Sequence, residues 1–517
     1  MKLMKYNYYI GFACLLACLL ALSIPATATE MNHSFLTGPY ETGQDVTAEC
    51  ISCHTEQAAD MVNSTHWLWS TCAECGCEEE KFADLGKRTV INNFCVAVAS
   101  NEPRCTSCHT GYGWEDNTFD FTNASNVDCV VCHETTNTYK KIPTGAGAVD
   151  PSVDLAAVAQ SVGSPTRATC GNCHFYGGGG DNVKHGDMSS ALLEPSRELD
   201  VHMGGMNFEC QNCHKTTAHN VAGRFAGEPG SECRVQCADC HSETPHQGEY
   251  GERLNEHTNS IACQTCHIPA YAREVPTKMY WDWSQAGEDR EFIPVDEYGK
   301  ATYHRMKGEF VWGMNVTPTY VWFNGSFDKY LLGDELDPES KTVLVQPLGD
   351  RYDEDSKIYP FKVHEGKQIS DAQYHYLIIP DLFGGENAYW TSFDWDKAAR
   401  AGMDYVDVPY SGEYEFVETA LYESINHEVA PKENALDCID CHLEGAAMDF
   451  GSLGYTGDPM IVGDRAISEE EIAQIKADKA TSEDAGQPSE DAQGTPGFEA
   501  LIALAGLLAA VLIARRR

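Results

Sequence analysis

The chain carries two long apolar runs, one near each end, and between them apolar and polar residues follow neither the helical nor the strand period for long. We therefore expect few long elements. Between residues 50 and 267 we expect short helices and irregular connections, such as the glycine run at 177–180, rather than a layered sheet. Residues 268–437 are rich in aromatic side chains, which predicts a segment that packs against the first part and shapes a pocket there, or only packs.

The first apolar run is typical of a secretory signal. Lys2 and Lys5 precede apolar residues at 9–24, and Ala-Thr-Ala at 26–28 forms a small-x-small cleavage site. Residues 1–28 are therefore expected to be a signal peptide. An uncleaved anchor is the alternative, although the run is short for a full membrane span.

The second apolar run closes a tail of three parts. An acidic stretch at 467–494, predicted to be a flexible linker, leads to Pro496-Gly497-Phe498, apolar residues and three terminal arginines. Residues 495–517 resemble the archaeal PGF-type sorting signal, in which the hydrophobic tail is replaced by a lipid. A plain transmembrane anchor is the alternative. Either reading places the protein on the outer face of the cytoplasmic membrane, at the cell surface, because the arginines would stay inside.

The chain is strongly acidic. It has 78 acidic and 36 basic residues and a formal net charge of -42. Nucleic acid and anionic lipid headgroups both need a basic surface and are therefore excluded as partners. The charge could steer a cationic partner or could only maintain solubility in salty surroundings.

The cysteines carry the clearest signal. Of 23 in the chain, sixteen form eight complete Cys-x-x-Cys-His units. These units are Cys50/Cys53/His54, Cys105/Cys108/His109, Cys129/Cys132/His133, Cys170/Cys173/His174, Cys210/Cys213/His214, Cys237/Cys240/His241, Cys263/Cys266/His267 and Cys438/Cys441/His442.

Each unit has the spacing for a covalently attached c-type haem. Two thiols three residues apart can add to the two vinyl groups of one haem, and the next residue places an imidazole under the iron. Zinc sites also use Cys-x-x-Cys pairs, but they need no histidine after every second cysteine, so we predict eight c-type haems.

Eleven histidines lie outside the motifs and could supply second axial ligands. Most of the candidates lie close to a motif in the sequence, and they favour irons with two histidine ligands, which relay electrons and bind no substrate. The candidates are His66, His185, His202, His219, His246, His257, His364 and His427.

Five further cysteines lie outside the motifs and the signal, and in an oxidising compartment we expect disulfides among them, with one thiol left over. Cys72 and Cys75 have the haem spacing but are followed by Gly76, which argues against a ninth haem. The five are Cys72, Cys75, Cys77, Cys95 and Cys233.

The predicted fold is a multihaem cytochrome c of mainly short α-helices and irregular loops packed around eight covalent haems, with little β-structure. We expect a haem domain at 29–267 with haems 1 to 7, and an aromatic-rich segment at 268–466 that returns to the haem array with haem 8.

The motifs and several local strings resemble the octaheme tetrathionate reductase family between residues 50 and 442. The strings are Asn101-Glu102-Pro103-Arg104, Gly111-Tyr112-Gly113-Trp114, Val183-Lys184-His185-Gly186-Asp187, Trp281-Asp282-Trp283, Pro360-Phe361-Lys362-Val363-His364 and Asn426-His427. The resemblance implies haem packing similar to that of pentahaem nitrite reductases and hydroxylamine oxidoreductases.

The resemblance also implies a catalytic haem at the second motif, with a lysine amine as an unusual iron ligand and seven other irons bound by two histidines. The lysine would be Lys140 or Lys141. If His109 and a lysine both bound that iron, no site would remain for substrate, so one of them must be displaced or never bind. A spare histidine could line the pocket as a proton donor.

Two functions follow. The first is a multielectron reductase that reduces tetrathionate, nitrite or hydroxylamine at the second haem, with electrons from redox partner proteins or membrane carriers. An anionic substrate would require a local positive funnel, because the surface as a whole is acidic. The second is a cell-surface electron conduit to extracellular acceptors or partners, in which no iron is open.

Overall fold

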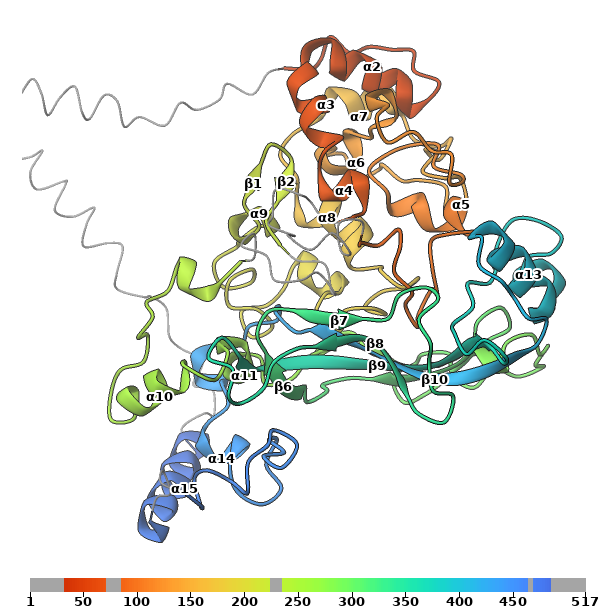
Figure 1. Cartoon of the computed structure of the whole chain (residues 1–517). Coiled ribbons are helices and arrows are strands. Elements are labelled where there is room, and N and C mark those ends of the chain that lie inside the picture. Colours follow the sequence, from red (N-terminus) through yellow and green to blue (C-terminus); the bar gives the residue numbers. More distant parts are fainter. Residues whose placement is uncertain (1–31, 71–84, 224–234, 464–467, 485–517) are drawn as a thin grey trace, which may run out of the picture. The chain divides into compact units, whose positions relative to one another are not determined.

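The computed structural model describes residues 32–70, 85–223, 235–463 and 468–484 (Figure 1). Its contacts divide the chain into two compact units, one that ends at Leu436 and one that begins at Asp437. The first unit contains seven of the haem motifs and the second contains the eighth.

The segment with the first seven motifs is built from short helices joined by irregular loops, as the sequence predicts. The longest is α2, whose N-terminus is closed by a capping box between Thr42 and Asp45. A second capping box, at Thr166, opens the helix that carries the fourth motif. The helices are α2 (Gly43–Cys53), α3 (Thr55–Met61), α4 (Thr65–Leu68), α5 (Glu102–Cys105), α6 (Val130–His133), α7 (Leu155–Gln160), α8 (Arg167–His174), α9 (Cys210–Cys213), α10 (Gly251–His257) and α11 (Cys263–His267).

The described strands of this segment are two short ones, β1 (Thr216–Thr217) and β2 (Asn220–Val221), which form an antiparallel pair.

Residues 268–436 form a large sheet, so the expectation of little β-structure is wrong. Eight strands take part, in the order β4-β5-β3-β9-β10-β8-β7, with β6 paired to β9. Helices α12 (Tyr389–Ser392) and α13 (Trp395–Tyr405) lie between the last two strands in the chain. The strands are β3 (Thr277–Asp282), β4 (Tyr303–His304), β5 (Gly308–Gly313), β6 (Thr319–Phe323), β7 (Phe327–Lys329), β8 (Thr342–Pro347), β9 (Lys357–Asp371) and β10 (Tyr414–Ser424).

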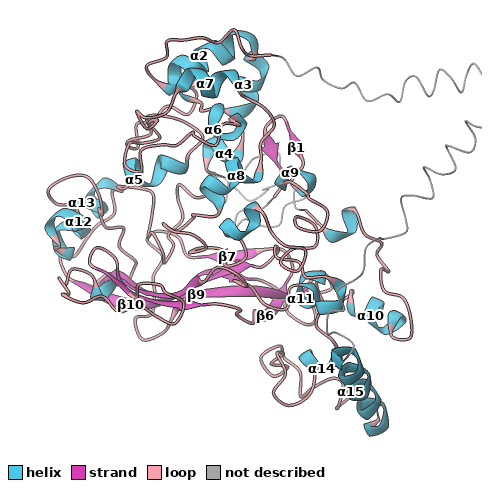
Figure 2. Cartoon of the chain, turned by 180° about the vertical axis from the view of Figure 1, so that it is seen from behind, coloured by secondary structure: helices cyan, strands magenta, loops and turns pink. Residues whose placement is uncertain are grey.

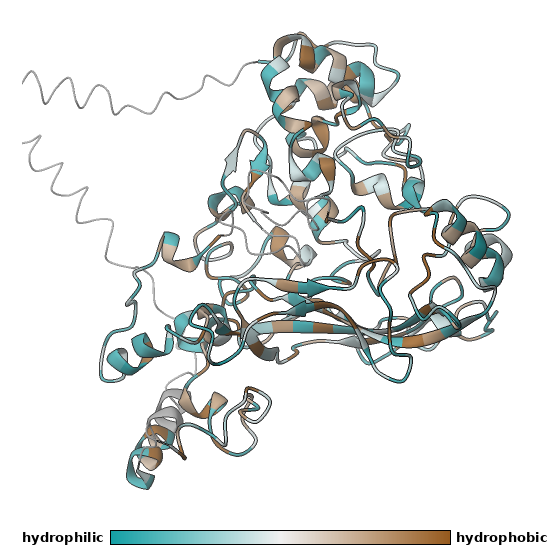
Figure 3. Cartoon of the chain, viewed as in Figure 1, coloured by the Kyte–Doolittle hydropathy of each residue, from teal (hydrophilic) through white to brown (hydrophobic). Residues whose placement is uncertain are grey.

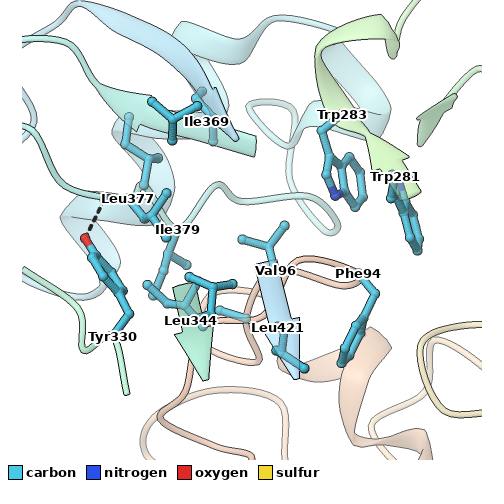
Figure 4. Close-up of a cluster of buried hydrophobic side chains, with 14 of the residues drawn as sticks. Phe94, Val96, Trp281, Trp283, Tyr330, Leu344, Ile369, Leu377, Ile379 and Leu421 are labelled. Atoms are coloured by element: carbon cyan, nitrogen blue, oxygen red, sulfur yellow. Dashed lines mark hydrogen bonds between the residues drawn. The ribbon is translucent and has the colours of Figure 1, made fainter. Parts of the chain in front are cut away.

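The two longest strands, β9 and β10, form the centre of the sheet and pair antiparallel from Ser424↔Phe361 to Tyr414↔Asp371. Hydrophobic and hydrophilic residues alternate along the strands (Figure 3), which is the pattern of a sheet with two different faces. A buried cluster that includes Trp281, Ile369 and Leu421 packs on it (Figure 4).

One face of the sheet contacts the haem-bearing segment, which is the part of the chain at 50–267 that carries the first seven motifs. The amide of Asn93 donates to the backbone oxygen of His364 on β9, at 2.7 Å. Lys362, also on β9, donates through Nζ to the backbone oxygens of Val183 and Lys184. Views from opposite sides show the sheet beside the segment that carries the first seven motifs (Figures 1 and 2).

The second unit contains α14 (Cys438–Cys441), with the eighth motif, and α15 (Glu469–Asp484). Thus the predicted acidic linker starts with a helix. No helix in the described ranges is long and apolar enough to cross a membrane. The signal peptide, the C-terminal apolar run and four of the extra cysteines, Cys72, Cys75, Cys77 and Cys233, lie outside the described residues.

Candidate functional site

The haem motifs lie on or beside single turns of helix. One helical turn brings residues i and i+3 to the same side, so the two thiols of a motif face one haem. The second motif spans α5 and the 3-10 turn Thr106–Cys108, the sixth begins the turn Cys237–Asp239, and the others lie on α2, α6, α8, α9, α11 and α14. All sixteen motif cysteines are thiols outside any disulfide, which haem attachment requires.

Cys240 and Cys266 show two variants of this arrangement. Cys240 is exposed and follows the last residue of its 3-10 turn, with φ -126° and ψ -27°, so the sixth motif is not contained in one helical element. The turn still closes, because the amide of His241 donates to the backbone oxygen of Cys237 at 2.9 Å.

Cys266 lies inside α11 and is half-buried, whereas Cys263 of the same motif is exposed. Its backbone oxygen accepts from the amide of Leu436 at 2.9 Å, which ties the seventh motif to the end of the first unit. Haem attachment at all eight motifs, through Cys240 and Cys266 as through the other cysteines, stays a prediction of the spacing.

Five motif histidines lie opposite another histidine at a distance that fits an iron between them. A metal–imidazole bond is about 2 Å long and the ring centre lies roughly 1 Å further, so two imidazoles on one iron have centres about 6 Å apart. The ring centres of the five pairs are 6.0 to 6.3 Å apart: His33–His54, His66–His174, His202–His241, His214–His427 and His246–His267.

A sixth pair, His133 and His219, also consists of neighbours. Burial lowers the pKa of His219, and the charge of His133 lowers it further. His133 belongs to the third motif, so the first, third, fourth, fifth, sixth and seventh motifs each have a histidine near their own.

The hydrogen bonds of several motif histidines orient them for iron. His133 and His214 each have Nδ1 bonded to a backbone oxygen, of Gly163 at 2.8 Å and of Ala222 at 2.6 Å. His442 has Nδ1 at 2.6 Å from Asp458. Such bonds fix the tautomer and leave Nε2 for the metal. The thiols, the ring spacing and the tautomers therefore fit c-type haem.

The structure separates the predicted axial candidates. His66, His202, His219, His246 and His427 lie near motif histidines, whereas His185 has Nδ1 at 3.6 Å from Glu423 and His257 bonds through Nδ1 to its own helix. His33 was not among the candidates. The signal that could have found it is its position, since it is the first histidine of the chain and precedes the first motif.

His364 is fully buried, and its described ring contact is with Phe94 rather than with a motif histidine. Its Nδ1 lies 2.9 Å from Oδ1 of Asn93, while Nε2 has no hydrogen-bond partner. Phe94 lies edge-on to the ring. Burial lowers the pKa of His364 well below its ordinary value, and the charges of Lys362 and Lys278 add to this, so the imidazole is neutral.

The histidine of the second motif is arranged differently. Nε2 of His109 lies 2.6 Å from the backbone oxygen of Trp67. That oxygen can only accept, so Nε2 carries the proton and donates it. Burial lowers the pKa of the ring to about 3. The nitrogen that is left for iron in His133 and His214 is thus engaged with the backbone in His109.

Aromatic side chains enclose His109 on several sides. The ring centres of Trp67, Trp69 and Trp114 lie 4.9 to 5.3 Å from that of His109, and those of Phe119 and Phe121 lie 5.8 and 6.3 Å away. These contacts were not predicted, although Trp114 belongs to one of the strings that carry the family resemblance.

The two candidate lysines differ sharply. The side chain of Lys140 is 60% exposed and lies 3.6 Å from Asp150. That of Lys141 is 5% exposed, with Nζ 2.8 Å from Oδ2 of the buried Asp128 and 2.6 Å from the backbone oxygen of His109. The structure thus brings Lys141, not Lys140, to the second motif.

A chain of hydrogen bonds continues from Lys141 into the protein. Asp128 accepts from the hydroxyl of Tyr139 at 2.8 Å, and this hydroxyl lies 3.1 Å from that of Tyr112. Burial raises the pKa of both tyrosines well above the ordinary value. The four side chains form a buried path of exchangeable protons.

Comparisons with known proteins agree with these features. Residues 278–445 match the family model "Cytochrome c bacterial", and residues 495–517 match the PGF-CTERM motif. An uncharacterised protein of Archaeoglobus fulgidus is 23% identical over 219 residues, 33% of this chain and 73% of its own. The PGF-CTERM motif marks an exported surface protein with a C-terminal anchor.

The structure also resembles the crystal structure of octaheme cytochrome c from Shewanella oneidensis, with a TM-score of 0.78 and 48% identity. The match covers 83% of this chain and 98% of that one. With this identity, this coverage and its eight motifs, the chain belongs to the family of octahaem c-type cytochromes.

Proposed function

We propose that the protein is an extracytoplasmic reductase that reduces a small sulfur or nitrogen compound, such as tetrathionate, nitrite or hydroxylamine, at the haem of the second motif. The observation that carries the proposal is the hydrogen bond from Nε2 of His109 to the oxygen of Trp67. It leaves the second haem without its motif histidine, so a position on the iron is available for substrate.

Lys141 is the proposed ligand that takes the place of His109. It is the buried lysine of the pair, and its Nζ lies against the second motif. Lysine must lose a proton before its amine can bind a metal. Asp128, at 2.8 Å, is placed to accept that proton. Lys141 then supplies the amine while His109 remains in its aromatic enclosure.

The haems supply the redox chemistry, because they hold and deliver the electrons that the reaction consumes. The protein supplies protons and position. Tyr139, Tyr112 and Asp128 form a buried hydrogen-bonded path that can move protons next to the second motif. The motifs whose histidines are paired would hold closed irons that pass electrons and bind no substrate.

A cell-surface electron conduit is the second candidate function. The C-terminal PGF-CTERM motif favours it, because an anchor on the outer face holds the haems between the membrane and external acceptors. In this case the second iron would be closed like the others.

The experiment that separates the two functions is low-temperature EPR with magnetic circular dichroism of the holoprotein, with and without nitrite or hydroxylamine. The reductase predicts one iron in eight with a lysine-type or high-spin signal that changes with substrate. Eight low-spin bis-histidine irons that ignore both compounds would contradict the reductase and leave the conduit.

A further inference from the structure

Three lysines gather where β3, β5 and β9 meet the haem-bearing segment. Lys278 lies on β3, Lys307 directly precedes β5, and Lys362 lies on β9. Lys278 is 4% exposed and Lys362 is fully buried. Nζ of Lys278 and Nζ of Lys307 lie 3.7 and 5.7 Å from the ring centre of Trp281, so the two amines are close together. Burial lowers the pKa of Lys278 well below its ordinary value, and the charges of Lys307 and Lys362 lower it further.

Two of these lysines have no carboxylate to balance them. In the described part of the chain, no ion pair or hydrogen bond joins Lys278 or Lys307 to an acidic side chain. Nζ of Lys278 instead lies 3.3 Å from the ring centre of Phe310 and 3.7 Å from that of Trp281. The neighbouring Lys184 shows the contrast, because its Nζ lies 3.5 Å from Glu423.

The absence of a carboxylate partner for Lys278 and Lys307 among the described residues is unexpected in so acidic a chain. With 78 acidic and 36 basic residues, carboxylates are abundant. A buried ammonium without a counter-ion is costly, so such a lysine loses its proton unless an anion enters from outside and stabilises the charged form. Aromatic rings lower this cost only in part, because a cation–π contact is weaker than the penalty for taking an ammonium group out of water.

The cluster lies next to the second motif. Cys95 and Ala97 pack in the same buried cluster as Trp281, the ring next to Lys278 and Lys307. Sγ of Cys105, in the second motif, lies 3.8 Å from the backbone oxygen of Ala97. Residues 95–97 therefore connect the lysines with the attachment site of the proposed catalytic haem. Phe94, next to Cys95, and Trp281 are drawn in Figure 4.

His364 adds a hydrogen-bonding atom to this group. Its Nε2 is buried without a partner, and the charges of Lys278 and Lys362 reach its ring. A protonated oxygen of a bound anion could donate to Nε2, which would satisfy a nitrogen that the protein leaves unpaired.

We propose that Lys278 and Lys307, with His364 beside them, bind the anionic substrate of the second haem, so that the substrate is an oxyanion such as nitrite or tetrathionate rather than uncharged hydroxylamine. This inference rests on the reductase function proposed above. The cluster supplies the local positive potential that an anion needs to approach a chain with a net charge of -42.

A haem propionate carries the same negative charge and is the competing occupant. The two occupants predict different results. A lysine that holds substrate affects anionic substrates only, whereas a lysine that holds a propionate affects the haem itself and hence every substrate.

The test compares the wild-type holoprotein with Lys278→Met and Lys307→Met, using nitrite, tetrathionate and hydroxylamine. We expect KM for the two anions to rise at least about tenfold in both variants, as for loss of a buried charge contact, and KM for hydroxylamine to stay within about twofold. Lys278→Arg keeps the charge and should retain most of the affinity for nitrite. Lys341→Met is the matched control, since Lys341 is 43% exposed and pairs with Glu365 on the same sheet.

Magnetic circular dichroism of each variant accompanies the kinetics. An equal loss for nitrite and hydroxylamine, a changed haem spectrum, or no change at all in either methionine variant would overturn the anion site. If the wild type reduces none of the three compounds, the reductase function fails, and calorimetric titration with nitrite then tests the site alone. Binding by the wild type that weakens at least about tenfold in Lys278→Met supports it, and absence of wild-type binding overturns it.

Discussion

The Nζ atom of Lys141 lies 2.8 Å from Oδ2 of Asp128, and both side chains are almost completely buried. Its neighbour Lys140 is largely exposed. Adjacent residues of the same type thus occupy opposite environments, and only the buried one is held by a carboxylate at the second motif. This difference gives the lysine hypothesis a direct test with a built-in control.

Replacing Lys141 by alanine should change the spectrum of one haem in eight. The variant loses the proposed amine ligand of the second iron, so its EPR signal should disappear and be replaced by another spin state. Lys140→Ala should keep the wild-type spectrum, because its side chain is 60% exposed. Identical spectra of both variants and the wild type would show that neither lysine binds iron.

Replacing Asp128 by asparagine should destabilise the protein by roughly 1–3 kcal/mol, because it removes the buried acceptor that Lys141 and Tyr139 share, each at 2.8 Å from Oδ2. Thermal or denaturant unfolding of the holoprotein measures the loss. The double variant Asp128→Asn/Lys141→Met should lose less than the sum of the two single variants, since it also removes the amine that has lost its acceptor. Additive losses in this cycle would mean that the two side chains do not interact.

Each histidine that lies near a motif histidine should be the second axial ligand of one iron. Replacing His33, His66, His202, His219, His246 or His427 by alanine, one at a time, should convert one low-spin iron to high spin, because that iron loses an axial ligand. Magnetic circular dichroism measures how many irons change their spin state. His375→Ala provides the control, since this side chain is 40% exposed and faces Glu415. If His33→Ala kept the wild-type spectrum, His33 would not be the second ligand of the iron bound by His54.

Glu428 should contribute a stabilisation that falls as the pH rises from about 4.5 to 8. Burial raises the pKa of this carboxyl to about 8, and Asp187 adds to the effect. Its Oε1 is buried without a partner, which favours the protonated form. An acid with a raised pKa in the folded state binds its proton more tightly there, so the stabilisation is complete below the unfolded pKa and is lost as pH passes the folded one.

Glu428→Gln mimics the protonated carboxyl and should flatten this decline, which thermal melts of the holoprotein between pH 4.5 and 8 measure. Glu433→Gln is the control, because Glu433 is half exposed and pairs with Arg197. An unchanged pH profile in Glu428→Gln would show that this carboxyl is ionised in the folded protein.

The attachment sites could be predicted from the sequence because they are local. Two cysteines and a histidine within five residues define each site, and one turn of helix brings them together whatever the rest of the fold does. The distal histidines are not local. His66 lies opposite His174, across the second and third motifs, so proximity in the sequence could not identify its partner.

The sheet could not be predicted from the density of haems. The haem motifs are dense only in residues 50–267, where the prediction of short helices is confirmed. Their density carries no information on residues 268–436, which form the sheet. The strand signals in 319–323 and 342–347, with their aromatic and β-branched residues, were present. The aromatic enclosure of His109 depends on tertiary contacts between 67–69 and 109–121 and had no local pattern.

The pair formed by His214 and His427 also affects how the protein folds and is loaded with haem. An iron bound by both would join the fifth motif to the residues just after β10, closing a loop that contains two other motifs and the whole sheet. Such a bond acts as a long-range cross-link that restricts the unfolded chain, much as a disulfide does. A chain cut before β10 would keep its fifth motif intact and still lose that haem's second ligand, so loading of this haem would depend on completion of the sheet.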